Sequence, residues 1–186
     1  HAPFLSAAQA LAMRIEDFIA ARIGSRQPTA AHKRDIAASF GRAAPGYEAA
    51  ASLQRETGAA LLAMLAPVAS RRVLDLGCGT GHFARQLAAR YPDAVVAAVD
   101  IAEGMLRHAH AGAPDRRIKW VCGDAEQLPL ATASIGLVFS NLALQWCADP
   151  QPAFAEIARV LAPGGRAAIA TLADDTLWEL RAAWRA

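Results

Sequence analysis

The chain has 186 residues, of which 54% are hydrophobic and 19% are charged. This composition suits one well-buried α/β domain and argues against disorder. Nineteen basic and seventeen acidic residues give a net charge of +2, which is too small for the electrostatic footprint of a nucleic-acid-binding protein.

The cysteines and the hydropathy of the sequence indicate the compartment and the kinds of site to expect. Cys78, Cys122 and Cys147 form no Cys-x-x-Cys pair, so free thiols in a reducing compartment are expected rather than disulfides or zinc. No apolar run reaches about 18 residues, and no basic and apolar leader begins the sequence. We therefore predict a cytoplasmic protein with no membrane partner. The histidines have no metal-ligand companions, so no metal site is expected.

The first thirty residues differ from those that follow. Leu11, Ile15, Phe18 and Ile19 recur at helical spacing and predict a helix over residues 6–23, followed by a polar linker that contains Pro28. A domain boundary is therefore expected near residue 30, with a main domain over residues 31–186. The simplest interpretation of residues 1–30 is an additional N-terminal helix.

Two helices are predicted before the first strand. The first is short, begins at Lys33 and is stopped by Pro45 and Gly46; the second covers residues 48–65. Gly58 inside the second costs about 1 kcal/mol of helix propensity. These helices, within residues 31–69, are candidates for a lid over a ligand. The alternative is that Phe40 and Tyr47 merely pack them onto the sheet.

A glycine-rich loop follows the first predicted strand. The apolar residues from Val73 to Leu76 give way to Gly77, Gly79 and Gly81, after which a helix begins. Glycine suits a position with positive φ or a close approach to a ligand, because it has no Cβ. Backbone N–H groups at the start of the helix favour negative or electron-rich ligand groups. The stretch predicts a nucleotide-like cofactor.

From this loop onward, strands and helices alternate over a core of residues 70–172. Helices are expected at 80–90, 103–111 and 152–161, and further strands at 95–100, 118–122, 137–140 and 166–171. This order indicates an α/β, Rossmann-like parallel sheet with helices on both faces. Ligands of such sheets bind at the carboxyl ends of the strands. That rule makes Gly77, Asp100, Asp124 and Ser140 neighbours.

Two aspartates at these strand ends give the predicted site its chemistry. Asp100, nineteen residues after Gly81, can accept both hydroxyls of a ribose. Asp124 can accept a hydrogen bond from an exocyclic amine such as that of adenine. His82 stands where a dinucleotide fingerprint requires its third glycine, and no lysine follows the glycines as in a P-loop. An adenosine cofactor without pyrophosphate or triphosphate is indicated.

Four motifs in order, residues 75–81, Asp100, residues 123–129 and residues 161–165, resemble the class I S-adenosylmethionine-dependent methyltransferases. The resemblance implies S-adenosyl-L-methionine as cofactor and S-adenosyl-L-homocysteine as product. It places the glycine loop beneath the methionine part, Asp100 on the ribose and Asp124 at the adenine. The residues expected to form the cofactor site are Arg42, Tyr47, Asp75, Gly77, Cys78, Gly79, Gly81, Asp100, Ile101, Met105, Gly123, Asp124, Ala125 and Ser140.

Within that family, residues 36–47, 53–55 and 139–147 look like the malonyl-acyl-carrier-protein O-methyltransferases of biotin synthesis. The likeness implies an acyl carrier protein bearing a malonyl group as partner, whose free carboxylate attacks the methyl group. Catalytic roles fall on Tyr47, Gln145 and Trp146, with Arg42 and Asn141 as further candidates for fixing the carboxylate. Two alternatives remain: transfer to another small carboxylic acid or metabolite, and a truncated cofactor-binding module without catalysis.

The two ends of the chain carry further expectations. Residues from His1 to Ser6 and the helix after them resemble the end of α/β-hydrolases, in particular the esterase that acts on pimeloyl-acyl-carrier-protein methyl ester. His1 would then be a triad histidine without its partners, so no hydrolase activity is expected. At the other end, the family's sixth and seventh strands are expected to be missing from this sequence, so residues 166–171 would form an exposed edge strand.

Overall fold

The computed structural model describes residues 30–65, 70–112, 115–147 and 149–172. The expected helix over residues 6–23 lies outside these residues. Five strands form one parallel sheet in the order β3-β2-β1-β4-β5. The strands are β1 (Arg72–Leu76), β2 (Val95–Asp100), β3 (Ile118–Cys122), β4 (Ile135–Asn141) and β5 (Leu161–Ala170). The predicted Rossmann-like α/β sheet is confirmed.

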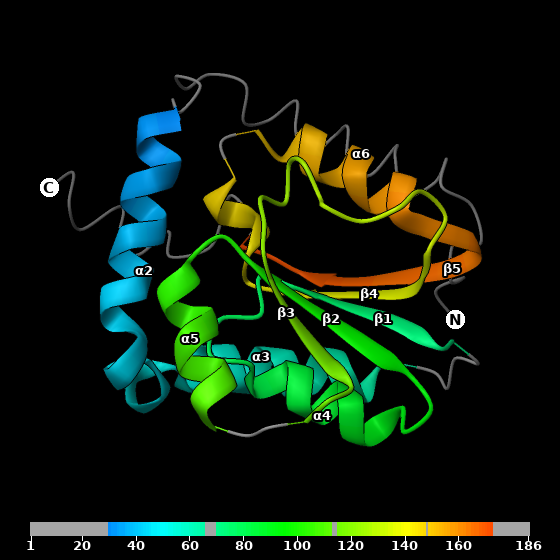
Figure 1. The fold of residues 1–186 in the computed structure, drawn as a ribbon, viewed down its shortest axis with the longest axis horizontal. Helices are drawn as coiled ribbons and strands as arrows, with labels where there is room; N and C mark the ends of the chain where they lie inside the picture. Colours follow the sequence, from blue (N-terminus) through cyan, green and yellow to red (C-terminus); the bar gives the residue numbers. More distant parts are fainter. Residues whose placement is uncertain (1–29, 66–69, 113–114, 148, 173–186) are drawn as a thin grey trace, which may run out of the picture.

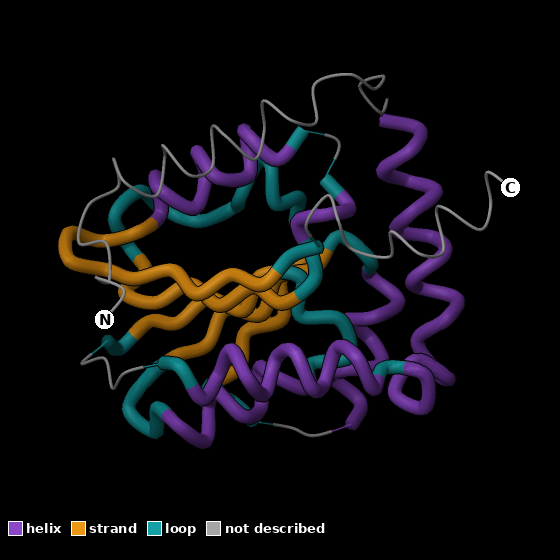
Figure 2. Tube along the Cα trace, turned by 180° about the vertical axis from the view of Figure 1, so that it is seen from behind, coloured by secondary structure: helices purple, strands orange, loops and turns teal. Residues whose placement is uncertain are grey.

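Helices cover both faces of the sheet (Figures 1 and 2). They are α2 (Ala30–Ala50), α3 (Ser52–Ala63), α4 (His82–Arg90), α5 (Glu103–Gly112), the short 3-10 helix η1 (Leu144–Trp146) and α6 (Pro150–Val160). Figure 1 shows α3, α4 and α5 on one side of the sheet, α6 on the other, and α2 across one end.

Alternate strand residues divide between two hydrophobic cores, as the period of two in a strand requires. Val73 of β1 packs with Phe83 and Leu87 of α4 on one face, whereas Leu74 packs with Ile157 of α6 on the other. Because helices cover both faces, the strands are mostly apolar, with charged exceptions such as Asp75 in β1 and Lys119 in β3. The sheet is thereby fixed, and the ends of its strands form a rigid base for a site.

Helix α2 differs from its prediction, because it continues through Pro45 to Ala50. An interior proline costs about 3 kcal/mol in an isolated helix. Here Ala44 is buried against Met105 of α5 in a third small core. A Cβ built on Gly104 would lie 2.7 Å from Cα of Gly41, so α2 and α5 cross in close contact. This tertiary packing outweighs the local helix-breaking signal.

The remaining boundaries differ by a few residues. Helix α4 begins at His82 because Gly81, with φ of 78°, is its N-cap. Helix α6 begins at Pro150, capped by the Asp149 side chain, which accepts a hydrogen bond from the backbone N of Gln151. Strand β5 is one edge of the sheet among the described residues, as predicted for this segment.

Candidate functional site

The glycine loop joins β1 to α4 and is held against the next strand. The backbone N atoms of Gly77 and Cys78 donate to O of Val99, at 2.8 and 3.1 Å. Gly77, Gly79 and Gly81 have φ of 77°, 53° and 78°, the left-handed region that favours glycine. A Cβ on Gly79 would meet nothing within 4 Å. The turn of the chain therefore requires glycine here, and Gly79 leaves open space beside it.

Asp100 ties this loop to the start of α5. Its Oδ2 accepts a hydrogen bond from Gly79 N and its Oδ1 accepts one from Ala102 N, each at 2.8 Å. Burial raises the pKa of Asp100, while the two backbone hydrogen bonds lower it in part. A carboxylate has about four acceptor positions, so Asp100 keeps two for a ligand.

Asp124 follows β3 and lies beside the carboxylate of Glu126. Its Oδ1 accepts from Glu126 N at 2.9 Å, and its Oδ2 accepts from Nζ of Lys33 at 2.6 Å. The same Nζ lies 2.8 Å from Oε2 of Glu126. Burial lowers the pKa of Lys33, but the two carboxylates outweigh this effect and hold that pKa above its ordinary value. The contact joins the first turn of α2 to the end of β3.

Aromatic side chains form another part of the site. The ring of Phe40 stands edge-on to Tyr47 and to Trp146, with centroid distances of 6.3 and 5.1 Å. Burial, the Asp100 carboxylate and Glu48 raise the pKa of the Tyr47 hydroxyl, so it stays protonated at neutral pH. Trp146 is 50% exposed. These rings offer an apolar wall with one hydroxyl donor.

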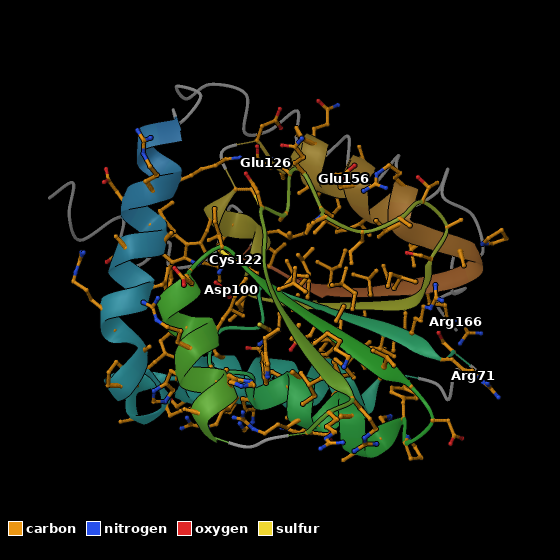
Figure 3. All side chains as sticks on the ribbon, viewed as in Figure 1. Arg71, Asp100, Cys122, Glu126, Glu156 and Arg166 are labelled. Carbon is orange, nitrogen blue, oxygen red and sulfur yellow. The ribbon has the colours of Figure 1, made fainter. Side chains whose placement is uncertain are left out.

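One cavity brings these parts together at the carboxyl ends of the strands. Figure 3 shows Asp100 and Glu126 at the end of the sheet beside α2, with Arg71 and Arg166 at the opposite end. The predicted residues that line the cavity are Tyr47, Gly77, Gly79, Asp100, Ile101, Met105, Gly123, Asp124, Ala125, Asn141 and Trp146.

Three predicted residues, Arg42, Gln145 and Ser140, lie outside the cavity lining. Their side chains are exposed to solvent or form hydrogen bonds with other segments. Arg42 is exposed on α2. Gln145 donates from Nε2 to O of Leu142 at 2.7 Å, and its Oε1 accepts from the Thr171 hydroxyl. Ser140 is fully buried and donates to O of Leu76 at 3.0 Å. These contacts give Gln145 and Ser140 structural roles between neighbouring segments.

Asp75, Cys78 and Gly81 also lie behind the lining, where they shape the loop. Asp75 is buried and accepts a backbone hydrogen bond from Ala84 in the first turn of α4; burial, and then the charge of Asp100, raise its pKa to about 8. Burial also raises the pKa of the Cys78 thiol well above its usual range. A Cβ on Gly81 would lie 2.4 Å from the ring of Trp120.

Sequence reasoning missed Lys33 and Glu126 as cavity residues. Lys33 is 91 residues from Asp124, so no local pattern connects them. The only available signal was the spacing of two carboxylates in Asp124-Ala125-Glu126, which indicates a local need for a cation. No group of three or more potential metal ligands occurs among the residues that the structure describes, and none of its helices is long and apolar enough to span a membrane.

The family comparison matches residues 74–169 to a model described as a methyltransferase domain. The chain is also similar to the malonyl-[acyl-carrier protein] O-methyltransferase of Methylococcus capsulatus, at 51% identity over 83% of this chain and 57% of that protein. It is also similar to the biotin biosynthesis bifunctional protein BioHC of Cellvibrio japonicus, at 47% identity over 100% of this chain and 36% of that protein. The chain thus spans little more than half the length of the first relative and about a third of the length of the second.

Solved structures of other methyltransferases share this fold. An S-adenosylmethionine-dependent methyltransferase from Mesorhizobium loti is similar with a TM-score of 0.56 and 37% identity, covering 61% of this chain and 52% of that one. An N-methyltransferase of Haemonchus contortus, solved with S-adenosylhomocysteine, has a TM-score of 0.57 and 28% identity, covering 70% of this chain and 32% of that one.

Proposed function

The chain belongs to the methyltransferase domain family, and on that premise we propose that it transfers a methyl group from S-adenosylmethionine to a malonyl group on acyl carrier protein. The observation that carries the cofactor assignment is one cavity lined by Gly77, Gly79, Asp100 and Asp124. The acceptor assignment is supported by the relative at 51% identity, which is named for this reaction.

The described residues fit this cofactor. Gly77 and Gly79 line the cavity, and Gly79 leaves open space at the loop, where the methionine part would lie. Asp100 has acceptor positions left for ribose hydroxyls, and Asp124 for the adenine amine. Ile101 and Met105 supply apolar surface between them. The described charged residues of the lining are three carboxylates and one lysine, a balance that suits a cationic ligand.

The residues of this chain would act by position rather than by proton transfer. The cofactor supplies an electrophilic methyl group on a sulfonium. A malonyl carboxylate is already ionised at pH 7, so the reaction needs no general base. The protonated Tyr47 hydroxyl can donate to that carboxylate, while Phe40 and Trp146 exclude water beside it. Alignment of the reacting atoms would contribute several kcal/mol.

For residues 1–30 we propose the end of an α/β-hydrolase domain. The support is the match to the bifunctional relative, which covers the whole of this chain. A methyltransferase and an esterase joined in one protein would add and later remove the same methyl ester. Only residue 30 of this segment is among those that the structure describes.

The test is incubation of the protein with methyl-labelled S-adenosylmethionine and malonyl-acyl carrier protein. We expect label in the acyl chain as a base-labile methyl ester, and none with acetyl-acyl carrier protein, which lacks the free carboxylate. Transfer to free small acids but not to the malonyl thioester would overturn the acceptor assignment. Binding of S-adenosylhomocysteine without transfer to any carboxylate would overturn catalysis.

A further inference from the structure

Lys33 lines the cavity, but the proposed reaction makes no use of its contacts. Its ammonium lies 2.6 Å from Asp124 and 2.8 Å from Glu126, and all three residues line the cavity. The side chain is 23% exposed, so this pair is better shielded than a typical surface salt bridge. Figure 3 shows Glu126 at the end of the sheet that α2 covers.

The charges of the cavity give this lysine a specific place. Among the described lining residues, Asp100, Asp124 and Glu126 are acidic and Lys33 is the only cation. Asp124 and Glu126 are two residues apart and would repel each other without it. Lys33 lies against both carboxylates and therefore offsets their mutual repulsion in a partly buried position.

The same contact fixes the direction of the Asp124 carboxylate. One oxygen accepts from the backbone N of Glu126 and the other from Lys33, so both ends of the group are held. Each oxygen still has an acceptor position, which a ligand amine can use. A carboxylate that is oriented before binding loses less conformational entropy when the ligand arrives.

We propose that Lys33 is the positioning residue for adenine recognition, because it orients the Asp124 carboxylate toward the 6-amino group of the cofactor. The inference rests on the proposed function, in particular on the placement of adenine at Asp124. Lys33 touches the carboxylate rather than the base, so its effect depends on the 6-amino group. A lysine that only pinned α2 would affect every cofactor analogue equally.

The experiment compares S-adenosylhomocysteine with S-inosylhomocysteine, which has an oxo group in place of the amine. Calorimetric affinities are measured for the wild type, Lys33→Met and Lys33→Arg. Lys33→Met retains the apolar stem and removes the charge. Lys119→Met is the matched control, since Lys119 is the only other lysine and is exposed on β3. Thermal unfolding of each variant checks its fold.

We expect Lys33→Met to weaken S-adenosylhomocysteine binding about tenfold and to reduce the preference for the amino compound, as loss of a charged hydrogen bond predicts. Lys33→Arg should restore part of that preference, and Lys119→Met should behave as wild type. Equal weakening of both ligands, unchanged affinity or tighter binding in Lys33→Met would overturn the proposal. Failure of the wild type to bind S-adenosylhomocysteine would instead overturn the proposed cofactor site.

Discussion

Gly58 offers a stability test in which sequence and structure predict opposite signs. In a helix, Gly58→Ala should gain about 1 kcal/mol of propensity. In the structure, Gly58 is buried, and a Cβ there would lie 2.1 Å from Cζ of Phe83 and 2.8 Å from Nδ2 of Asn141. Phe83 belongs to the core and is only 8% exposed, so its ring has little room to move. Overpacking of this kind costs about 1–3 kcal/mol. After the propensity gain is subtracted, we expect a net loss of up to about 2 kcal/mol in the free energy of unfolding.

Gly46→Ala is the matched control for this substitution. Gly46 lies in α2, and a Cβ there would meet nothing within 4 Å. The same change should therefore stabilise the protein by about 0.5–1 kcal/mol. Urea unfolding followed by far-ultraviolet circular dichroism gives both values, provided that the m-values agree. A Gly58→Ala protein that gains as much stability as Gly46→Ala would refute the packing argument.

Two further predictions concern Asp100, at the end of β2, and Asp75, in β1. Asp100→Asn leaves one acceptor oxygen for two backbone donors, so we expect a cost of about 1–3 kcal/mol in unfolding free energy and weaker S-adenosylhomocysteine binding by calorimetry. Unchanged affinity would remove Asp100 from the site. Burial raises the pKa of Asp75 from 3.8 to about 8, so the folded protein retains a proton that the unfolded chain releases between these values. Stability should fall as pH rises through this window, by up to about 1.4 kcal/mol per pH unit, and Asp75→Asn should flatten the profile measured by urea unfolding.

The parts of the site that follow strands could be predicted from the sequence. Gly77, Asp100 and Asp124 each come directly after an apolar run, and parallel strands place their carboxyl ends at one edge. The order of these residues along the chain and one rule of sheet topology were therefore enough to predict that they lie together. Ser140 obeyed the same rule, but its side chain turned into the sheet to bond Leu76. Position at an edge does not determine where a side chain points.

Tyr47 was expected from the family resemblance, but the full length of α2 and the contact of Lys33 could not be predicted, because they depend on tertiary packing. Pro45 and Gly46 signal a helix end, yet the face that packs on α5 keeps the helix intact. Lys33 and Asp124 are 91 residues apart, and their contact exists only once α2 has docked. A pattern in a single sequence reveals neither the packing of α2 on α5 nor the contact between Lys33 and Asp124.

The cavity depends on α2 as much as on the glycine loop. Lys33, Phe40 and Tyr47 line it from one helix, whereas Asp100 and Asp124 line it from the sheet. The close crossing of Gly41 and Gly104 sets the distance between these two walls. A bulkier residue at that crossing would have to push α2 outward, and the ammonium of Lys33 would move away from Asp124 with it. The proposed geometry of adenine recognition would therefore be linked to a helix crossing that touches no ligand, and packing far from the reacting atoms would then affect cofactor affinity.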